Sequence, residues 1–161
     1  MKHIIPMFTM LVAVIGRPIF AAELPGAPAG TFSIAVISDT QHYRGKKSKA
    51  QPDSSKPITN PVFKAYASWV AGNIEKQRIA FVSHVGDIVD INNRDQWTVA
   101  RRHMDLLHGR VPYGISVGNH DMTRVGDSSL FQNFFPAKRF EKFDWYGGYF
   151  QKASGRSAVS G

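Results

Sequence analysis

Three short apolar runs, each followed by a polar turn, most constrain how this chain can fold. The runs span residues 31–38, 79–83 and 113–117, and the turns after them begin at Asp39, Gly86 and Gly118. Their length and their β-branched residues predict buried strands. Helical patterns separate the runs, and this alternation predicts parallel strands joined by right-handed crossovers. We therefore expect an α/β domain whose three turns meet at the carboxyl edge of one sheet, where ligands bind in such folds.

Two helices are expected between these strands. The first begins at Asn60, a capping residue that Pro61 follows. Its apolar residues recur at steps of three and four and predict the face that packs on the sheet: Val62, Tyr66, Trp69, Val70 and Ile74. The second helix spans about residues 93–107 and ends before Gly109, with an inner face of Trp97, Ala100, Met104 and Leu107. A short third helix is expected near residues 128–134.

The composition indicates one globular domain. The chain has 161 residues, of which 43% are hydrophobic and 20% charged. It contains no cysteine, which excludes disulfides and thiolate zinc sites. The formal charge of +8 is compatible with an anionic partner such as nucleic acid, and equally with a solvated basic surface.

The first 22 residues have the layout of a secretory signal peptide. Lys2 precedes an apolar run over residues 4–15, and Ala21 and Ala22 supply a small-residue cleavage site. The run is short for a membrane span, although an uncleaved anchor or a buried helix stays open. We expect a secreted or periplasmic protein in which residues 23–30, with two prolines and two glycines, form a linker.

The turns carry side chains that suit metal chemistry. Asp39, Asp87, Asn119 and His120 offer oxygen and nitrogen donors of the kind that bind divalent Mn, Fe, Zn or Mg. Gly86 and Gly118 allow the sharp backbone bend that such a site requires. A single turn of this kind is commonly an ordinary loop end, but three in this order predict a site. The basic loop over residues 41–56 leaves the same strand end as Asp39, so it is either a solvated loop or attracts an anionic substrate.

The motifs Asp39-Thr40-Gln41, Gly86-Asp87-Ile88-Val89-Asp90 and Gly118-Asn119-His120-Asp121 resemble the first three signature blocks of the calcineurin-like metallophosphoesterases, over about residues 31–150. The resemblance implies a two-metal hydrolase of phosphate esters. It also implies a four-layer fold, in which two mixed sheets pack together and helices flank them, and the first βαβαβ half of that fold is present here.

The resemblance also implies residue roles. Asp39 would bind the first metal, Asp87 would bridge both metals, and Asn119 would bind the second. His120 would contact the scissile phosphate, and we expect Asp121 to orient the His120 imidazole. We expect Asp90 to fix its turn or to hydrogen-bond neighbouring ligands.

Two features depart from the family pattern. Its first block is usually Asp-x-His, whereas Gln41 and His42 stand here, and we favour Gln41 as the first-metal ligand. We expect His84 to lie in the core or to support the ligands.

The family has two further histidine blocks, and this sequence has no histidine after His120. We therefore expect residues 31–161 to be the N-terminal part of a larger domain, a fragment with an incomplete ligand set. Two alternatives to a phosphoesterase remain, namely a phosphodiesterase or nuclease of the same mechanism and a non-catalytic secreted binding module.

Overall fold

The computed structural model describes residues 24–148, 150–151 and 157–158, and a three-stranded parallel sheet lies at its centre. The strands are β1 (Ser33–Ile37), β2 (Ile79–His84) and β3 (Tyr113–Ile115), in the order β1-β2-β3. Ile37 pairs with His84, which pairs with Ile115, so the three strands end level with one another. The turns that follow them therefore leave one edge of the sheet, as the sequence predicts.

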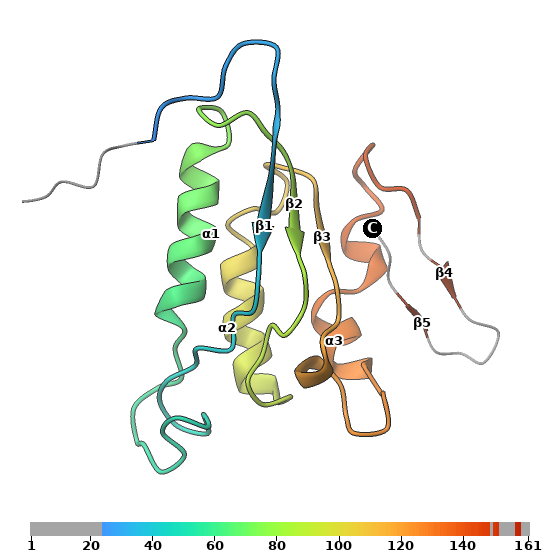
Figure 1. Ribbon diagram of the computed structural model, residues 1–161. Coiled ribbons are helices and arrows are strands. Elements are labelled where there is room, and N and C mark those ends of the chain that lie inside the picture. Colours follow the sequence, from blue (N-terminus) through green and yellow to red (C-terminus); the bar gives the residue numbers. More distant parts are fainter. Residues whose placement is uncertain (1–23, 149, 152–156, 159–161) are drawn as a thin grey trace, which may run out of the picture.

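Both expected crossover helices are present on one face of the sheet (Figure 1). They are α1 (Pro61–Asn73) and α2 (Arg94–Met104). Each begins after an asparagine whose side chain accepts a hydrogen bond from the backbone three residues later, at 2.9 Å in both helices. Since the N-caps are satisfied in this way, both helices start where the sequence predicts.

The buried face of α2 is as expected, but that of α1 is not. Trp97, Ala100 and Met104 are fully buried in α2. Leu107 is also fully buried, but it follows the helix, which ends at Met104 and not near residue 107 as expected. In α1 the buried residues are Phe63, Ala67, Val70 and Ala71, whereas Tyr66 and Trp69 are nearly half exposed. The observed and predicted sets have the same spacing but differ by one residue, a rotation of about 100°. Alanines at 67 and 71 let the helix approach the sheet closely, which the bulkier predicted set would prevent.

The other face of the sheet is open in the described residues. Ile34 and Val36 project from it with exposed fractions of 57% and 64%. Beyond β3 lie two short 3-10 helices, α3 (Ser129–Phe134) and the two-stranded antiparallel pair β4 (Phe150–Gln151) and β5 (Ser157–Ala158) (Figure 1). The expectation of an α/β fold that contains the first βαβαβ half is confirmed.

Only part of the N-terminal predictions concerns residues that the structure describes. The signal peptide predicted over residues 1–22 lies outside the described residues. Residues 24–30 have no regular structure, but Ala27 N donates to Lys76 O at 3.0 Å, which ties this stretch to the turn before β2. No helix within the described ranges is long and apolar enough to cross a membrane.

Candidate active site

The turns after β2 and β3 pack backbone against backbone. Gly86 and Asp87 both have positive φ, 98° and 51°, and the value at Asp87 is uncommon for a residue other than glycine. A Cβ at Gly86 would lie 2.8 Å from Gly118 N, and one at Gly118 would lie 2.1 Å from Asp87 Oδ1. Only glycine fits at both positions, and the close approach lets His120 N donate to Asp87 Oδ1 at 3.1 Å.

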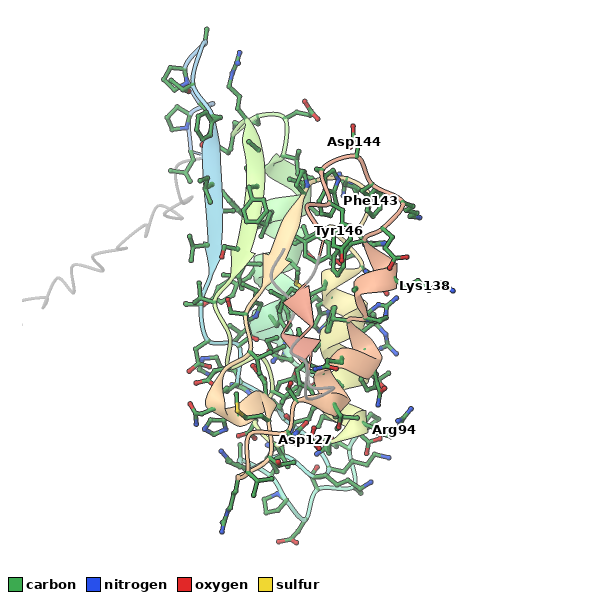
Figure 2. All side chains as sticks on the ribbon, turned by 90° about the vertical axis from the view of Figure 1, so that its right-hand side faces the viewer. Arg94, Asp127, Lys138, Phe143, Asp144 and Tyr146 are labelled. Atoms are coloured by element: carbon green, nitrogen blue, oxygen red, sulfur yellow. The ribbon has the colours of Figure 1, made fainter. Side chains whose placement is uncertain are left out.

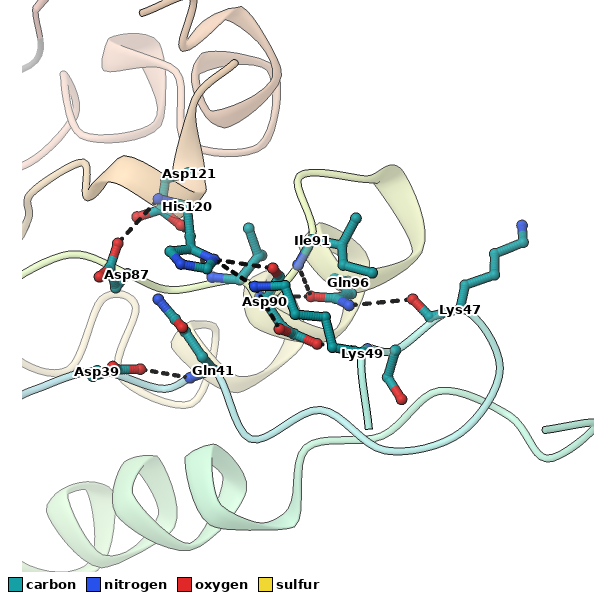
Figure 3. Close-up of polar contacts among 12 residues, drawn as sticks. Asp39, Gln41, Lys47, Lys49, Asp87, Asp90, Ile91, Gln96, His120 and Asp121 are labelled. Atoms are coloured by element: carbon teal, nitrogen blue, oxygen red, sulfur yellow. Dashed lines mark hydrogen bonds and ion pairs between the residues drawn. The ribbon is translucent and has the colours of Figure 1, made fainter. Parts of the chain in front are cut away.

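The turn after β1 meets the same pair of turns. Thr40 N donates to Asp87 O at 3.1 Å, and Gln41 N donates to Asp39 Oδ1 at 2.9 Å. Figure 3 shows Asp39, Gln41, Asp87 and His120 gathered at this edge of the sheet. The structure thus brings together residues that lie up to 81 positions apart in the sequence.

The His120 ring is held by its Nδ1 atom. This atom lies 3.1 Å from Asp90 O and 3.1 Å from Lys49 Nζ. An ammonium only donates, so Nδ1 cannot both donate to Asp90 O and accept from Lys49. Lys49 Nζ also lies 3.3 Å from Asp90 Oδ1. All groups are satisfied when Nδ1–H donates to the carbonyl and Lys49 pairs with the carboxylate, which leaves Nε2 of His120 available.

Asp90 joins the basic loop to this site. Its carboxylate is buried and accepts from Lys49 N at 2.8 Å, in addition to the ion pair with the Lys49 side chain. Gln96 Oε1, at the start of α2, accepts from Asp90 N at 2.7 Å and from Ile91 N at 2.9 Å. The particular roles of Lys49 and Gln96 were not predicted from the sequence. A signal existed for Gln96, since it stands three residues after the Asn93 cap, where a glutamine often bonds to backbone amides.

Asp121 does not have the position expected of it. It was expected to orient the His120 ring, but its buried carboxylate accepts from Ile88 N, Val89 N and Gly118 N at 2.9–3.0 Å. The 3-10 turn over Asn119–Asp121 directs this carboxylate back beneath the two loops. Burial raises the pKa of Asp121, and the three amide hydrogen bonds oppose that shift. Asp121 therefore fastens the turns together, and the Asp90 carbonyl is the group that orients His120.

His84 lies in the core, as expected. Its ring is fully buried, and Thr40 Oγ1 donates to Ile88 O at 3.0 Å. The hydroxyl can then only accept from His84 Nε2, which lies 3.1 Å away, while His84 Nδ1 accepts from Gly86 N at 3.3 Å. Burial lowers the pKa of His84 to about 4, so the ring is neutral and its Nδ1 can accept from the Gly86 amide.

The four predicted metal ligands come from two kinds of position. Asp39, Gln41 and Asp87 lie at one edge of the sheet, and Asn119 lies exposed on the 3-10 turn beside His120. No group of three or more acidic, histidine or cysteine side chains that could hold a metal ion occurs in the described part of the chain. Two of the four predicted ligands are amides, which leaves Asp39 and Asp87 as the anionic donors.

Comparisons with known proteins agree with these motifs. The family model for calcineurin-like phosphoesterases matches residues 32–157. The uncharacterized protein YvnB of Bacillus subtilis (strain 168) is 32% identical over 137 residues, a match that covers 83% of this chain and 10% of that protein. The chain thus spans about a tenth of this relative's length.

Among solved structures, the purple acid phosphatase PPD1 from yellow lupin (Lupinus luteus) seeds is similar with a TM-score of 0.43 and 18% identity. That match covers 68% of this chain and 21% of the phosphatase chain. The range that the family model matches contains all the residues described above at the candidate site.

Proposed function

The chain belongs to the calcineurin-like phosphoesterase family, and from this premise we propose that it takes part in the metal-dependent hydrolysis of phosphate esters. The main support is the contact between Gly118 and Asp87, in which a Cβ would lie 2.1 Å from the carboxylate. This contact sets an acidic side chain directly against the turn that carries Asn119 and His120.

We propose Asp39 and Gln41 as ligands of one divalent metal ion, Asn119 as a ligand of a second, and Asp87 as the shared ligand. The donor chemistry fits, because carboxylate and amide oxygens suit Mn, Mg, Fe or Zn. Asp39 and Asp87 each have one oxygen without a hydrogen bond to another described residue. An anionic residue is the appropriate bridge between two cations. Metal ions bound in such a pair lower the pKa of a bound water and neutralise phosphate oxygens.

His120 is the proposed contact to the substrate. Its Nδ1–H is held by Asp90 O, which leaves Nε2 for the substrate. When the ring is an imidazolium, Nε2–H can donate to a phosphate oxygen or to the leaving group. Lys49 also lies beside His120, where its ammonium pairs with the Asp90 carboxylate and holds the basic loop against the site. The two anionic ligands are few for two divalent cations, so we propose that further ligands come from outside the described residues.

Manganese titration by calorimetry tests this proposal. We expect Asp87→Asn to weaken Mn²⁺ binding at least tenfold, since it removes the shared negative charge. The matched control is Asp53→Asn, an exposed aspartate in the loop over residues 41–56, which should leave binding unchanged. If the native chain binds neither Mn²⁺ nor Zn²⁺ at micromolar affinity and Asp87→Asn changes nothing, the chain is better explained as a non-catalytic binding module.

A phosphodiesterase or nuclease of the same mechanism is the second candidate function. It is supported by the formal charge of +8 and by the basic loop over residues 41–56, which brings Lys49 to His120. Rates on bis(p-nitrophenyl) phosphate and p-nitrophenyl phosphate separate the two functions. Faster hydrolysis of the diester would favour the phosphodiesterase.

We also propose export to the periplasm or the medium, based on the pattern of residues 1–22. The mass of the mature protein tests it: cleavage after Ala22 would leave Glu23 as the first residue. An intact N-terminus would instead favour an anchor.

A further inference from the structure

We propose that the cavity between α1 and α2 binds a small organic anion, namely a carboxylate carried on a short apolar chain. The cavity measures about 500 Å³ and lies between the first turn of α1 and the C-terminal half of α2. None of the residues placed at the candidate active site lines it. The inference therefore goes beyond the proposed hydrolysis, and testing it requires neither metal nor turnover.

The cavity carries positive charge without a negative partner. Lys64 and Arg102 line it, and neither forms an ion pair with another described residue. No acidic side chain is among the lining residues. Burial lowers the pKa of His103, and the positive charges of Arg102 and Lys64 lower it further. Both cations are thus close enough to His103 to act on it electrostatically.

His103 supplies a buried polar atom that needs a partner. The side chain lines the cavity and is 8% exposed, and its Nε2 atom has no hydrogen-bond partner in the described part of the chain. The ring packs edge-on against Phe63 with centroids 5.5 Å apart, which restricts its rotation. A buried polar atom without a partner is unfavourable. When the ring carries a proton on Nε2, a carboxylate oxygen accepts from it, so an anion would satisfy the atom that the described residues leave without a partner.

The apolar part of the lining indicates that the ligand also carries an apolar group. Ile58, Val99 and Leu106 form much of the wall. The volume lies within the range of about 300–1,000 Å³ typical of small-molecule pockets and far exceeds one carboxylate group. A bare inorganic anion would leave this apolar wall in contact with water. A carboxylate with a short hydrocarbon chain would cover this apolar wall and supply the negative charge that the two lining cations lack.

Octanoate is the probe for the test, followed by NMR on the full chain. We expect saturable shifts of amides in residues 58–64 and 99–106, together with a shift of the His103 ring nitrogen as Nε2 gains a partner. Lys64→Met and Arg102→Met should each weaken binding about tenfold, the usual effect of losing one charge-assisted hydrogen bond. Both side chains are exposed, so their loss should leave the fold intact, which a thermal melt checks.

Lys138→Met is the matched control, because it removes the same charge from an exposed position outside the cavity. It should bind octanoate as the native chain does. 1-Octanol tests the need for the charge and should bind at least tenfold more weakly than octanoate. Equal binding of 1-octanol, equal weakening by Lys138→Met, or shifts confined to residues 32–36 on the open sheet face would each overturn the proposal.

Discussion

At the scale of single residues, the absence of a side chain at position 118 decides how close the second and third turns can lie. A Cβ there would come within 2.3 Å of Asp87 N as well as contacting the carboxylate. Backbone atoms cannot yield as the end of a flexible side chain can. Gly118→Ala should therefore destabilise the protein by about 2–3 kcal/mol and displace Asp87. Urea unfolding measures the first effect, and the loss of Mn²⁺ affinity measures the second.

Gly72→Ala is the control for this substitution. Gly72 lies exposed in α1, and a Cβ there meets nothing within 4 Å. Alanine in a helix is favoured over glycine by about 0.5–1 kcal/mol, so this variant should be slightly more stable. If the urea midpoint of unfolding of Gly118→Ala equals or exceeds that of the native protein, the two turns are not held at the distance that the structure indicates.

His84 gives the protein a pH dependence of known sign. Its pKa of about 4 lies below the usual value near 6.5 because the ring is buried. Between these values the unfolded chain binds the proton and the folded chain does not, so protonation favours unfolding. The stability that depends on neutral His84 is thus complete above pH 6.5 and declines as the pH falls towards 4, by about 3 kcal/mol in all.

His84→Gln isolates this effect. Burial also lowers the pKa of His103 and of His108, so the native protein alone cannot assign the pH dependence to one residue. The difference in unfolding free energy between native and variant proteins cancels those contributions. That difference should move in favour of the variant between pH 7 and pH 4. A difference that stays constant between pH 7 and pH 4 would mean that His84 takes up its proton equally in the folded and unfolded states.

At the scale of secondary-structure elements, the first turn of α2 organises two loops through one buried side chain. Gln96 accepts from Asp90 N and Ile91 N, and it is fully buried. Gln96→Leu keeps a similar volume but leaves both amides without an acceptor. We expect a loss of about 2–4 kcal/mol in urea unfolding. Hydrogen exchange should also become faster at Lys49 N, whose acceptor belongs to Asp90.

Thr98→Ala on the exposed side of the same helix provides the comparison. It should change stability by no more than about 0.5 kcal/mol. If Gln96→Leu is equally mild, water replaces the side chain at these amides, and the loops do not depend on α2.

The same elements explain what the sequence can and cannot predict. The starts of α1 and α2 and the ends of β1 and β2 were predictable to within one residue, because Asp39, Gly86, Asn60 and Asn93 act on the backbone beside them. The end of β3 was not, since this strand ends at Ile115, two residues earlier than expected. The face of α1 was not, because apolar residues occur on two sides of that helix and only the fit of Ala67 and Ala71 against the sheet selects one. The predicted role of Asp121 was likewise wrong, because its partners Ile88 and Val89 lie 32–33 positions earlier in the sequence. Lys49 reaches His120 through a loop conformation that no local pattern encodes.

At the scale of the whole molecule, helices cover one face of the sheet, and among the described residues the opposite face is apolar and exposed along β1. Figure 2, turned from Figure 1, shows the edges of the sheet with the helices on one side. β1 is an edge strand, and residues 31–38 contain no charged side chain. Natural edge strands commonly carry a lysine or proline that blocks pairing with another chain. The described part of the molecule is therefore prone to self-association through β1.

Val36→Lys should reduce that association. Val36 is 64% exposed at this face, so a lysine there places a charge in solvent and should cost little stability. The matched control is Val125→Lys, which removes an equally apolar and even more exposed side chain from a loop away from the sheet. Sedimentation velocity over a range of concentrations should show the native chain and the Val125 variant associating, and the Val36 variant remaining monomeric. Equal behaviour of the two variants would mean that the added charge alone suppresses association. A monomeric native chain would mean that the open face does not mediate self-association.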